Sequence, residues 1–214
     1  MAELAEAGIT FSRVPPHRAD EVMTLLWDHF IPHEPLSRSL NITESKPGTL
    51  QNYLIEMLFK DAIKTGKSVM AEKDGKIVGV RVAEVLERTG WARWCTDKIF
   101  DLVVDYGLIW LFDRKLHRIC KINKLLISKW LGYNVWNTFN TYNCDKVLSA
   151  ICLCSVNSGI RGVGTELVKQ SEELGREEGC AMTSVVVTGQ LFQLFHSPVL
   201  IFSAPSLLLL FCKI

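Results

Sequence analysis

Hydrophobic and polar residues along the first third of the chain recur with the periods of strands and amphipathic helices. Residues 9–14 alternate as a half-buried strand does, and a Pro-Pro pair ends them. Across 17–30 the apolar positions recur every three or four residues, which predicts a helix with one buried face. A loop with prolines at 32 and 35 follows. A second stripe of the same spacing predicts a helix from the Pro47-Gly48 turn to Gly66.

The next segment has the pattern of a β-hairpin. Alternating apolar residues over 68–73 and 76–85 flank Asp74-Gly75. An Asp-Gly pair suits a type I′ turn, because both central residues of that turn need a positive φ and these two tolerate it. We therefore expect two antiparallel strands joined by a tight turn.

A strand, a glycine-rich loop, a helix and a second strand follow one another between residues 146 and 188. The apolar, partly β-branched run 146–153 predicts a central strand, and the loop after it reads SVNSGIRGVG. Apolar spacing predicts a helix over 165–178 that Gly179 terminates, and residues 181–188 predict another strand. This order is typical of a βαβ crossover, so the two strands are expected to be parallel neighbours.

Two segments show no clear period. Residues 91–143 mix apolar stripes with Lys and Arg, and they predict one or two helices on the outside of a sheet. A membrane-surface helix is the alternative there, because basic residues cluster with tryptophans. Residues 191–214 are apolar, with one lysine and no acid, but Gln, His and Pro interrupt them. We therefore expect no membrane span in this tail, with membrane attachment through it as the minor alternative.

Composition and charge narrow the class of protein. The 214 residues predict one domain by length, and a formal net charge of +1 argues against a dedicated nucleic-acid-binding protein. The N-terminus is acidic and lacks the apolar stretch of a signal peptide. The seven cysteines form no Cys-x-x-Cys pair, so we expect buried free thiols, no metal site and a cytoplasmic location.

The glycine-rich loop carries the candidate chemistry. Gly162 and Gly164 remove side chains where a ligand would approach the backbone, and Arg161 adds a positive charge just before the helix. A helix N-terminus of this kind can bind a phosphate or pyrophosphate, although a plain helix-capping turn has the same pattern. It is no Walker loop, because no Gly-Lys-Ser/Thr follows. The antiparallel hairpin that precedes it disagrees with a Rossmann fold.

The order of elements and two short motifs resemble the GCN5-related N-acetyltransferase superfamily. The run RGVGTELVKQSEELGREEGC, beginning at Arg161, is similar to that superfamily's acyl-CoA pyrophosphate loop and the helix after it. HEPLSRSL at 33–40 resembles the Asp-Glu-Pro-Leu stretch of insect arylalkylamine N-acetyltransferases, and the whole resemblance covers residues 9–190. It implies an α/β fold with a mixed sheet. It also implies an enzyme that transfers an acetyl group from acetyl-CoA to a small aromatic amine by direct attack, and we expect that enzyme to be a monomer.

The resemblance also implies roles for individual residues. Glu34 matches the family's catalytic glutamate and is expected to remove a proton from the amine as general base. Leu153 and Cys154, at the end of the central strand, are expected to contact acetyl-CoA, with a backbone N–H near Cys154 facing the thioester oxygen. The pyrophosphate is expected on the backbone of five consecutive residues: Arg161, Gly162, Val163, Gly164 and Thr165.

Several positions depart from the family pattern. Gly159 stands where the family usually has Gln or Arg, the glycine run is shortened, and His33 replaces the usual Asp. The family's last helix and strands have no visible counterpart after residue 190. We therefore expect an incomplete acetyltransferase-like domain over 1–190 and an atypical apolar tail over 191–214. A non-catalytic protein that binds acyl-CoA or a partner is the alternative function.

Three aromatic residues are candidates for an amine pocket, with the hydrophobic core as their other interpretation. They are Trp27, Phe30 and Tyr53. The first two follow helical spacing, which is the pattern of a buried helix face. The sequence therefore predicts where an aromatic substrate would bind only through the resemblance.

Overall fold

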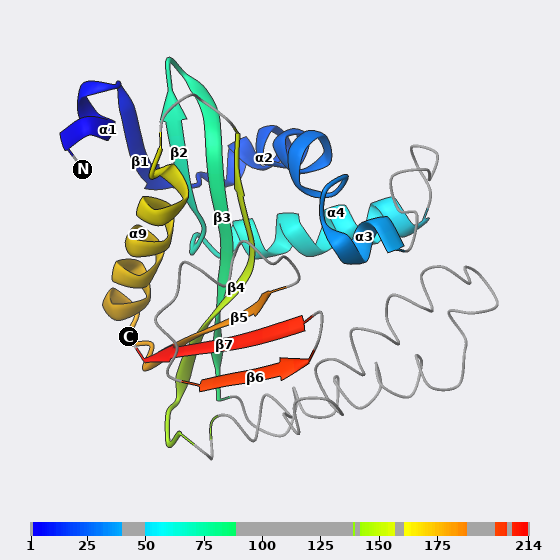
Figure 1. Cartoon of the computed structure of the whole chain (residues 1–214), viewed down its shortest axis with the longest axis vertical. Helices are drawn as coiled ribbons and strands as arrows, with labels where there is room; N and C mark the ends of the chain where they lie inside the picture. The colour runs from blue at the N-terminus through cyan, green and yellow to red at the C-terminus, as the bar shows by residue number, and fades with distance from the viewer. Residues whose placement is uncertain are drawn as a thin grey trace.

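The computed structural model describes residues 2–39, 50–88, 139, 142–156, 161–187, 200–204 and 207–213. Within these residues one sheet has the strand order β1-β2-β3-β4-β5-β7-β6 (Figure 1). The strands are Ile9–Arg13 (β1), Val69–Lys73 (β2), Lys76–Glu87 (β3), Lys146–Ser155 (β4), Met182–Val187 (β5), Leu200–Ala204 (β6) and Leu207–Lys213 (β7). The helices are Ala2–Glu6 (α1), the 3₁₀-helix Pro16–Arg18 (η1), Ala19–Leu25 (α2), the π-helix Leu26–Phe30 (η2), Pro35–Ser39 (α3), Leu50–Lys64 (α4) and Val163–Glu177 (α9).

The sheet is antiparallel except between β4 and β5, which run parallel. The helix α9 joins these two strands, so the predicted crossover is confirmed. The predicted hairpin is confirmed as well, because β2 pairs with β3 and both turn residues have positive φ, 50° at Asp74 and 77° at Gly75. The elements predicted over 9–85 and 146–188 agree with the observed bounds to within two residues. The helix α1 was not predicted, and α3 lies in the segment that was predicted to be a loop.

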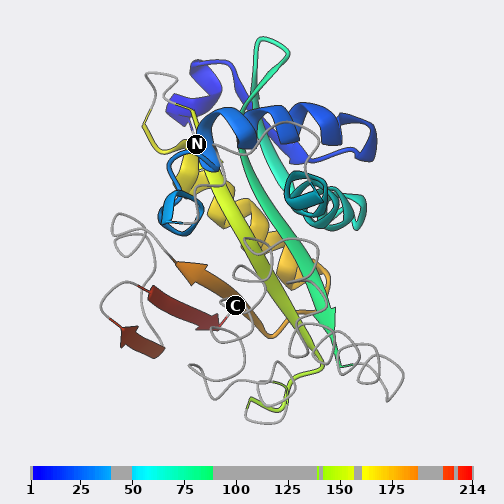
Figure 2. The same cartoon turned by 90° about the vertical axis from the view of Figure 1, so that its right-hand side faces the viewer.

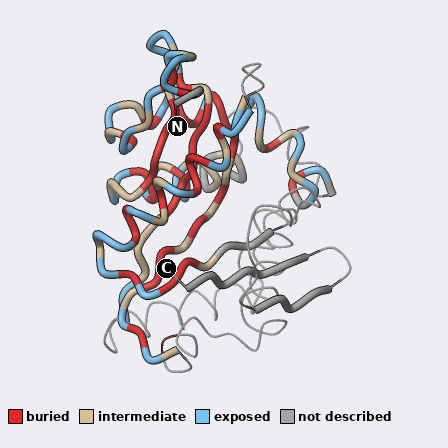
Figure 3. The backbone as a smooth tube through the Cα atoms, turned by 60° about the vertical axis from the view of Figure 1, so that its left-hand side comes forward, coloured by how far each residue is buried: buried red, intermediate tan, exposed pale blue. Residues whose placement is uncertain are grey.

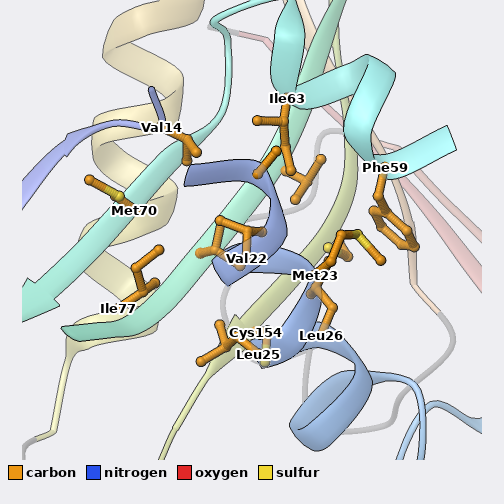
Figure 4. Close-up of a cluster of buried hydrophobic side chains, with 14 of the residues drawn as sticks. Val14, Val22, Met23, Leu25, Leu26, Phe59, Ile63, Met70, Ile77 and Cys154 are labelled. Carbon is orange, nitrogen blue, oxygen red and sulfur yellow. The ribbon is translucent and has the colours of Figure 1, made fainter. Parts of the chain in front are cut away.

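Helices cover both faces of the β1–β4 half of the sheet (Figure 2). On one face Val22 of α2, Leu26 of η2 and Ile63 of α4 are buried in one cluster with Val80 of β3 (Figure 4). On the opposite face α9 packs against β2 through the fully buried Leu167. Buried residues are concentrated along the strands between these two layers (Figure 3). This packing fixes both α9 and η2 relative to β4.

Gly79 of β3 lets α9 approach the sheet closely. A Cβ at this position would lie 3.0 Å from Leu167 Cδ1, 3.3 Å from Val163 Cγ1 and 3.2 Å from the carbonyl oxygen of Cys154. Real Cβ atoms are rarely this close to a neighbour, so the packing of α9 itself explains the glycine. The N-terminal turn of α9 is thereby held over the ends of β3 and β4.

An ion cluster ties the first helices to the hairpin. The Arg18 guanidinium bonds Glu21 at 2.8 Å and also contacts Glu72, while the Ile77 N–H donates to Glu21 at 3.3 Å. The hydrogen bond from Arg18 lowers the pKa of the Glu21 carboxyl below its usual range. The cluster therefore anchors η1 and α2, and with them the start of η2, on β2 and β3.

The expectation that no further strands follow residue 190 was wrong. β7 pairs antiparallel with β5 from Met182↔Lys213 to Val187↔Leu208, and β6 pairs with β7. The run 207–212 is continuously apolar, and such a run shows no period of two that would distinguish a strand. The fold class is confirmed, and the sheet includes the two final strands. Residues 188–199, where the family's last helix would lie, are outside the described residues.

Most of the 91–143 segment also lies outside the described residues, so its predicted helices stay predictions. From this segment Phe139 is buried in a cluster with Val147 and Met182. Among the described helices, none combines the length and the apolar character needed to cross a membrane.

Candidate active site

The strands β4 and β5 separate halfway along β4. Their parallel pairing runs from Val147↔Met182 to Ala150↔Val185 and stops there, while β4 continues to Ser155. The pairing of β3 with β4 shifts register at the same point, since Val82 pairs with Cys152 and Ala83 with Ala150. Such a bulge bends and twists its strand. β5, β7 and β6 therefore leave the β3–β4 pair at an angle (Figures 1 and 2).

Beyond Ala150, where β4 no longer pairs with β5, alternate backbone N–H groups of β4 point away from β3 and toward the side where β5 would otherwise pair. The N–H of Val156 donates to the carbonyl of Val78 at 2.9 Å, so Val156 points toward β3. Backbone groups alternate along a strand, and Cys154 therefore points toward β3 as well. The N–H groups of Leu153 and Ser155 face the opposite side. The backbone N–H that was expected near Cys154 to face the thioester oxygen would therefore belong to Leu153 or to Ser155. The sequence analysis did not name Ser155.

The N-terminus of α9 presents backbone N–H groups without a side-chain cap. Gly162 is the N-cap residue, and its φ of 92° favours glycine. Because glycine has no side chain, it provides no side-chain hydrogen bond to cap the helix. The first intrahelical bond runs from the Glu166 N–H to the Gly162 carbonyl, at 3.0 Å. The N–H groups of Val163, Gly164 and Thr165 therefore have no acceptor within the helix. N–H groups without a partner at a helix N-terminus are the donors that bind anions in other proteins.

Gly164 brings this N-terminus beside the end of β4. A Cβ at this position would lie 3.8 Å from Leu153 Cδ2 and 3.9 Å from Ser155 Oγ, which is ordinary van der Waals contact. In contrast to Gly79, no close packing within the described protein demands a glycine here. The missing side chain keeps the N–H groups open, which fits a ligand lying along the backbone. Arg161 is exposed immediately before this turn.

Glu34 lies on the other face of the sheet, between η2 and α3. Trp27 and Phe30 of η2 are half-buried and pack against the cluster that includes Cys152 and Cys154 of β4. The two aromatic residues therefore contribute to the core, as their alternative interpretation predicted; the side chain of Tyr53 is outside the described residues. Glu34 is partly buried, and its carboxylate accepts a hydrogen bond from the Ser37 N–H. His33 is exposed beside it.

The π-helical geometry of η2 was not predicted. The N–H of Ile31 bonds the carbonyl of Leu26, five residues earlier, at 2.9 Å. Such turns are frequent at functional sites, but the apolar spacing of 17–30 is equally consistent with an ordinary helix. The sequence pattern does not distinguish a π-helix from an α-helix here, because tertiary packing determines whether a turn contains the extra residue.

Among the residues whose side chains the structure describes, four cysteines are buried and free, as predicted: Cys144, Cys152, Cys154 and Cys180. Burial raises the pKa of the Cys154 thiol to about 11, and it raises the pKa of Cys152 above its usual range. Both thiols are therefore protonated at neutral pH and are poor nucleophiles. In the described ranges no group of three or more His, Cys, Asp or Glu residues could hold a metal ion.

We expect Cys152 and Cys154 to resist alkylation in the folded protein. With a pKa near 11, only about 0.1% of Cys154 is thiolate at pH 8, and the side chain is buried as well. Iodoacetamide labelling at pH 8, followed by peptide mass spectrometry, should modify both residues only after unfolding in guanidinium. Labelling of native Cys154 at the rate of a free thiol would contradict the burial described here.

Comparison with solved structures identifies the fold. An arylalkylamine N-acetyltransferase 2 from Aedes aegypti is 26% identical, with a TM-score of 0.67 over 87% of this chain and 79% of that one. The chain belongs to the GCN5-related N-acetyltransferase superfamily. Two further structures are each 16% identical to this chain: a mosquito arylalkylamine N-acetyltransferase-like 5b protein, with a TM-score of 0.70, and a Drosophila melanogaster polyamine N-acetyltransferase, with a TM-score of 0.67. Each match covers 96% of this chain and 100% of the other. At this identity the two structures show the fold alone. No protein-family model and no curated protein sequence matches the chain.

In this acetyltransferase fold the predicted site residues fall into two groups. Leu153, Gly164 and their neighbours come together where α9 begins over the end of β4. Glu34 lies on the opposite helical layer, which contacts β4 through η2. The two groups thus approach the same half of β4 from its two faces, and their assigned roles stay predictions.

Proposed function

We propose that this chain is an acetyl-CoA-dependent N-acetyltransferase that acts on an arylalkylamine. The observation that carries the proposal is the uncapped N-terminus of α9, whose open N–H groups lie beside the strand end that β5 has left. Acetyl-CoA would supply the activated acetyl group. Val163, Gly164 and Thr165 would bind its pyrophosphate through their N–H groups, with Arg161 adding a positive charge at the mouth of the loop.

Glu34 would act as the general base. An arylalkylammonium with a pKa near that of lysine, about 10.4, is protonated at neutral pH and cannot attack a thioester. A carboxylate that accepts its proton, directly or through a water, makes the nitrogen lone pair available. The N–H of Leu153 or Ser155 would then stabilise the negative charge that develops on the thioester oxygen. The nitrogen forms the new amide bond as the carbon–sulfur bond breaks. The second proton that the nitrogen then loses is balanced by a proton that the thiolate gains from solvent, and coenzyme A leaves as the thiol.

Direct transfer agrees with the chemistry of the cysteines. An acyl-enzyme route would need a thiolate near the thioester, and Cys152 and Cys154 are the cysteines on β4. Burial raises the pKa of both thiols, which makes them unsuitable for that role. The proposed step therefore uses no nucleophile from the protein.

The choice of an aromatic amine rests on the HEPL motif and on the 26% identity to a mosquito arylalkylamine enzyme. We expect purified protein to acetylate tryptamine or dopamine with acetyl-CoA at a higher kcat/KM than agmatine or spermidine. Thiol release would be followed in steady state, with product identified by mass spectrometry. A preference for agmatine would retain the acetyltransferase and overturn the aromatic assignment.

A non-catalytic acyl-CoA-binding protein is the second candidate. One observation favours it, since His33 stands beside Glu34 where the family usually has Asp. Acetyl-CoA binding by calorimetry, without turnover of any of these four amines, would support this candidate. Measurable steady-state acetylation would exclude it.

A further inference from the structure

Glu34 occupies a helix position that glutamate rarely fills. It directly precedes α3, and its carboxylate accepts a hydrogen bond from the N–H of Ser37, the third residue of that helix. This is the N-cap bond, which short side chains such as Ser, Asp and Asn usually make. A residue that violates a local preference while making the local contact often has a second function. Capping alone would be served better by aspartate.

The backbone around Glu34 forms a continuous hydrogen-bonded path from η2 into α3. The Glu34 N–H donates to the Phe30 carbonyl at 2.9 Å, and the Arg38 N–H donates to the Glu34 carbonyl at 3.0 Å. Phe30 itself packs on the cluster that contains Cys154. The backbone of Glu34 is therefore fixed relative to β4.

We propose that the backbone N–H of Ser37 is a positioning group for the general base. Ser37 is 8% exposed, so its N–H is held in place by the surrounding protein. A carboxylate has about four lone-pair sites on two oxygens, so one bond to the backbone does not exhaust its capacity as an acceptor. The Ser37 N–H would restrict the side-chain rotamers of Glu34 and present the carboxylate to the ammonium in one orientation. This inference rests on the proposed function, because it assumes that Glu34 is the base.

Two substitutions at one position isolate the N–H. Ser37→Ala and Ser37→Pro both remove the buried hydroxyl, but only Ser37→Pro removes the N–H, and proline is tolerated in the first helical turn. We expect kcat for tryptamine to be roughly 10- to 100-fold lower in Ser37→Pro than in Ser37→Ala. KM for acetyl-CoA should be similar in the two variants, because α9 holds that substrate. Glu3→Pro, in the equally short α1 on the opposite side of the molecule, should leave kcat unchanged (Figure 1).

Glu34→Asp provides a second test if Ser37→Pro does not fold. Aspartate is a good N-cap residue, so melting temperature should not fall, but its carboxylate is one methylene shorter. We expect kcat to fall about 100-fold while the fold is retained. Full kcat in Glu34→Asp, or equal kcat in Ser37→Pro and Ser37→Ala, would overturn the positioning role. Full kcat in Glu34→Gln would instead overturn the assignment of Glu34 as base, and with it the proposed mechanism.

Discussion

Replacement of Glu34 by glutamine is expected to lower kcat for tryptamine by about 100- to 10,000-fold, the range that general-base catalysis contributes. Glutamine keeps the length of the side chain and an oxygen that can accept the Ser37 N–H, so the cap is preserved. It cannot take a proton from the ammonium. The dissociation constant for acetyl-CoA, measured by calorimetry, should stay near the wild-type value, because Glu34 and α9 lie on opposite faces of the sheet.

The matched control is Asp28→Asn. Asp28 is an exposed carboxylate of η2, six residues before Glu34, and the substitution makes the same change of charge. Its kcat should equal that of the wild type. If Glu34→Gln turned over tryptamine at the wild-type rate, another group would have to remove the proton.

Acetyl-CoA is expected to stabilise the folded protein strongly. At about 100 times its dissociation constant, a ligand that binds only the native state adds about 2.7 kcal/mol to the free energy of unfolding. For a chain of this size that corresponds to a rise of roughly 5–10 °C in melting temperature. The Gly164→Ala variant should lose about half of this shift or more at the same ligand concentration. A methyl group there would lie over the N–H groups of α9 and weaken pyrophosphate binding about tenfold or more.

The ligand-free proteins provide the controls for this experiment. Ligand-free Gly164→Ala should melt no lower than the wild type, because alanine favours helix and its Cβ would make ordinary contacts of 3.8 and 3.9 Å. Gly79→Ala should melt lower, since its Cβ would lie 3.0 Å from Leu167 Cδ1, yet acetyl-CoA should still raise its melting temperature. An undiminished shift in Gly164→Ala would place the acetyl-CoA pyrophosphate elsewhere.

Local patterns were sufficient for the elements that frame the site. The Asp74-Gly75 turn needs positive φ at both residues, and few other dipeptides allow this, so the hairpin could be predicted without tertiary information. The crossover through α9 followed from the order of strand, glycine loop, helix and strand. The final strands could not be predicted, because the apolar run 207–212 carries no period and its partner β5 is more than twenty residues away in sequence.

The site itself divides in the same way. The sequence by itself indicated the glycines at the start of α9, because they depend on residue type at short spacing, and it indicated Glu34 as the candidate base only through the family resemblance. Only the tertiary structure decided which N–H groups of β4 point away from β3, toward the side where the pairing with β5 has ended. Their direction depends on the bulge near Cys152 and on the hydrogen-bond register with β3. The tertiary structure alone distinguished Gly79, required by packing, from Gly164, which no close packing demands. The engagement of Glu34 by Ser37 also needed the structure, because side-chain hydrogen bonds depend on where the packed backbone places each donor.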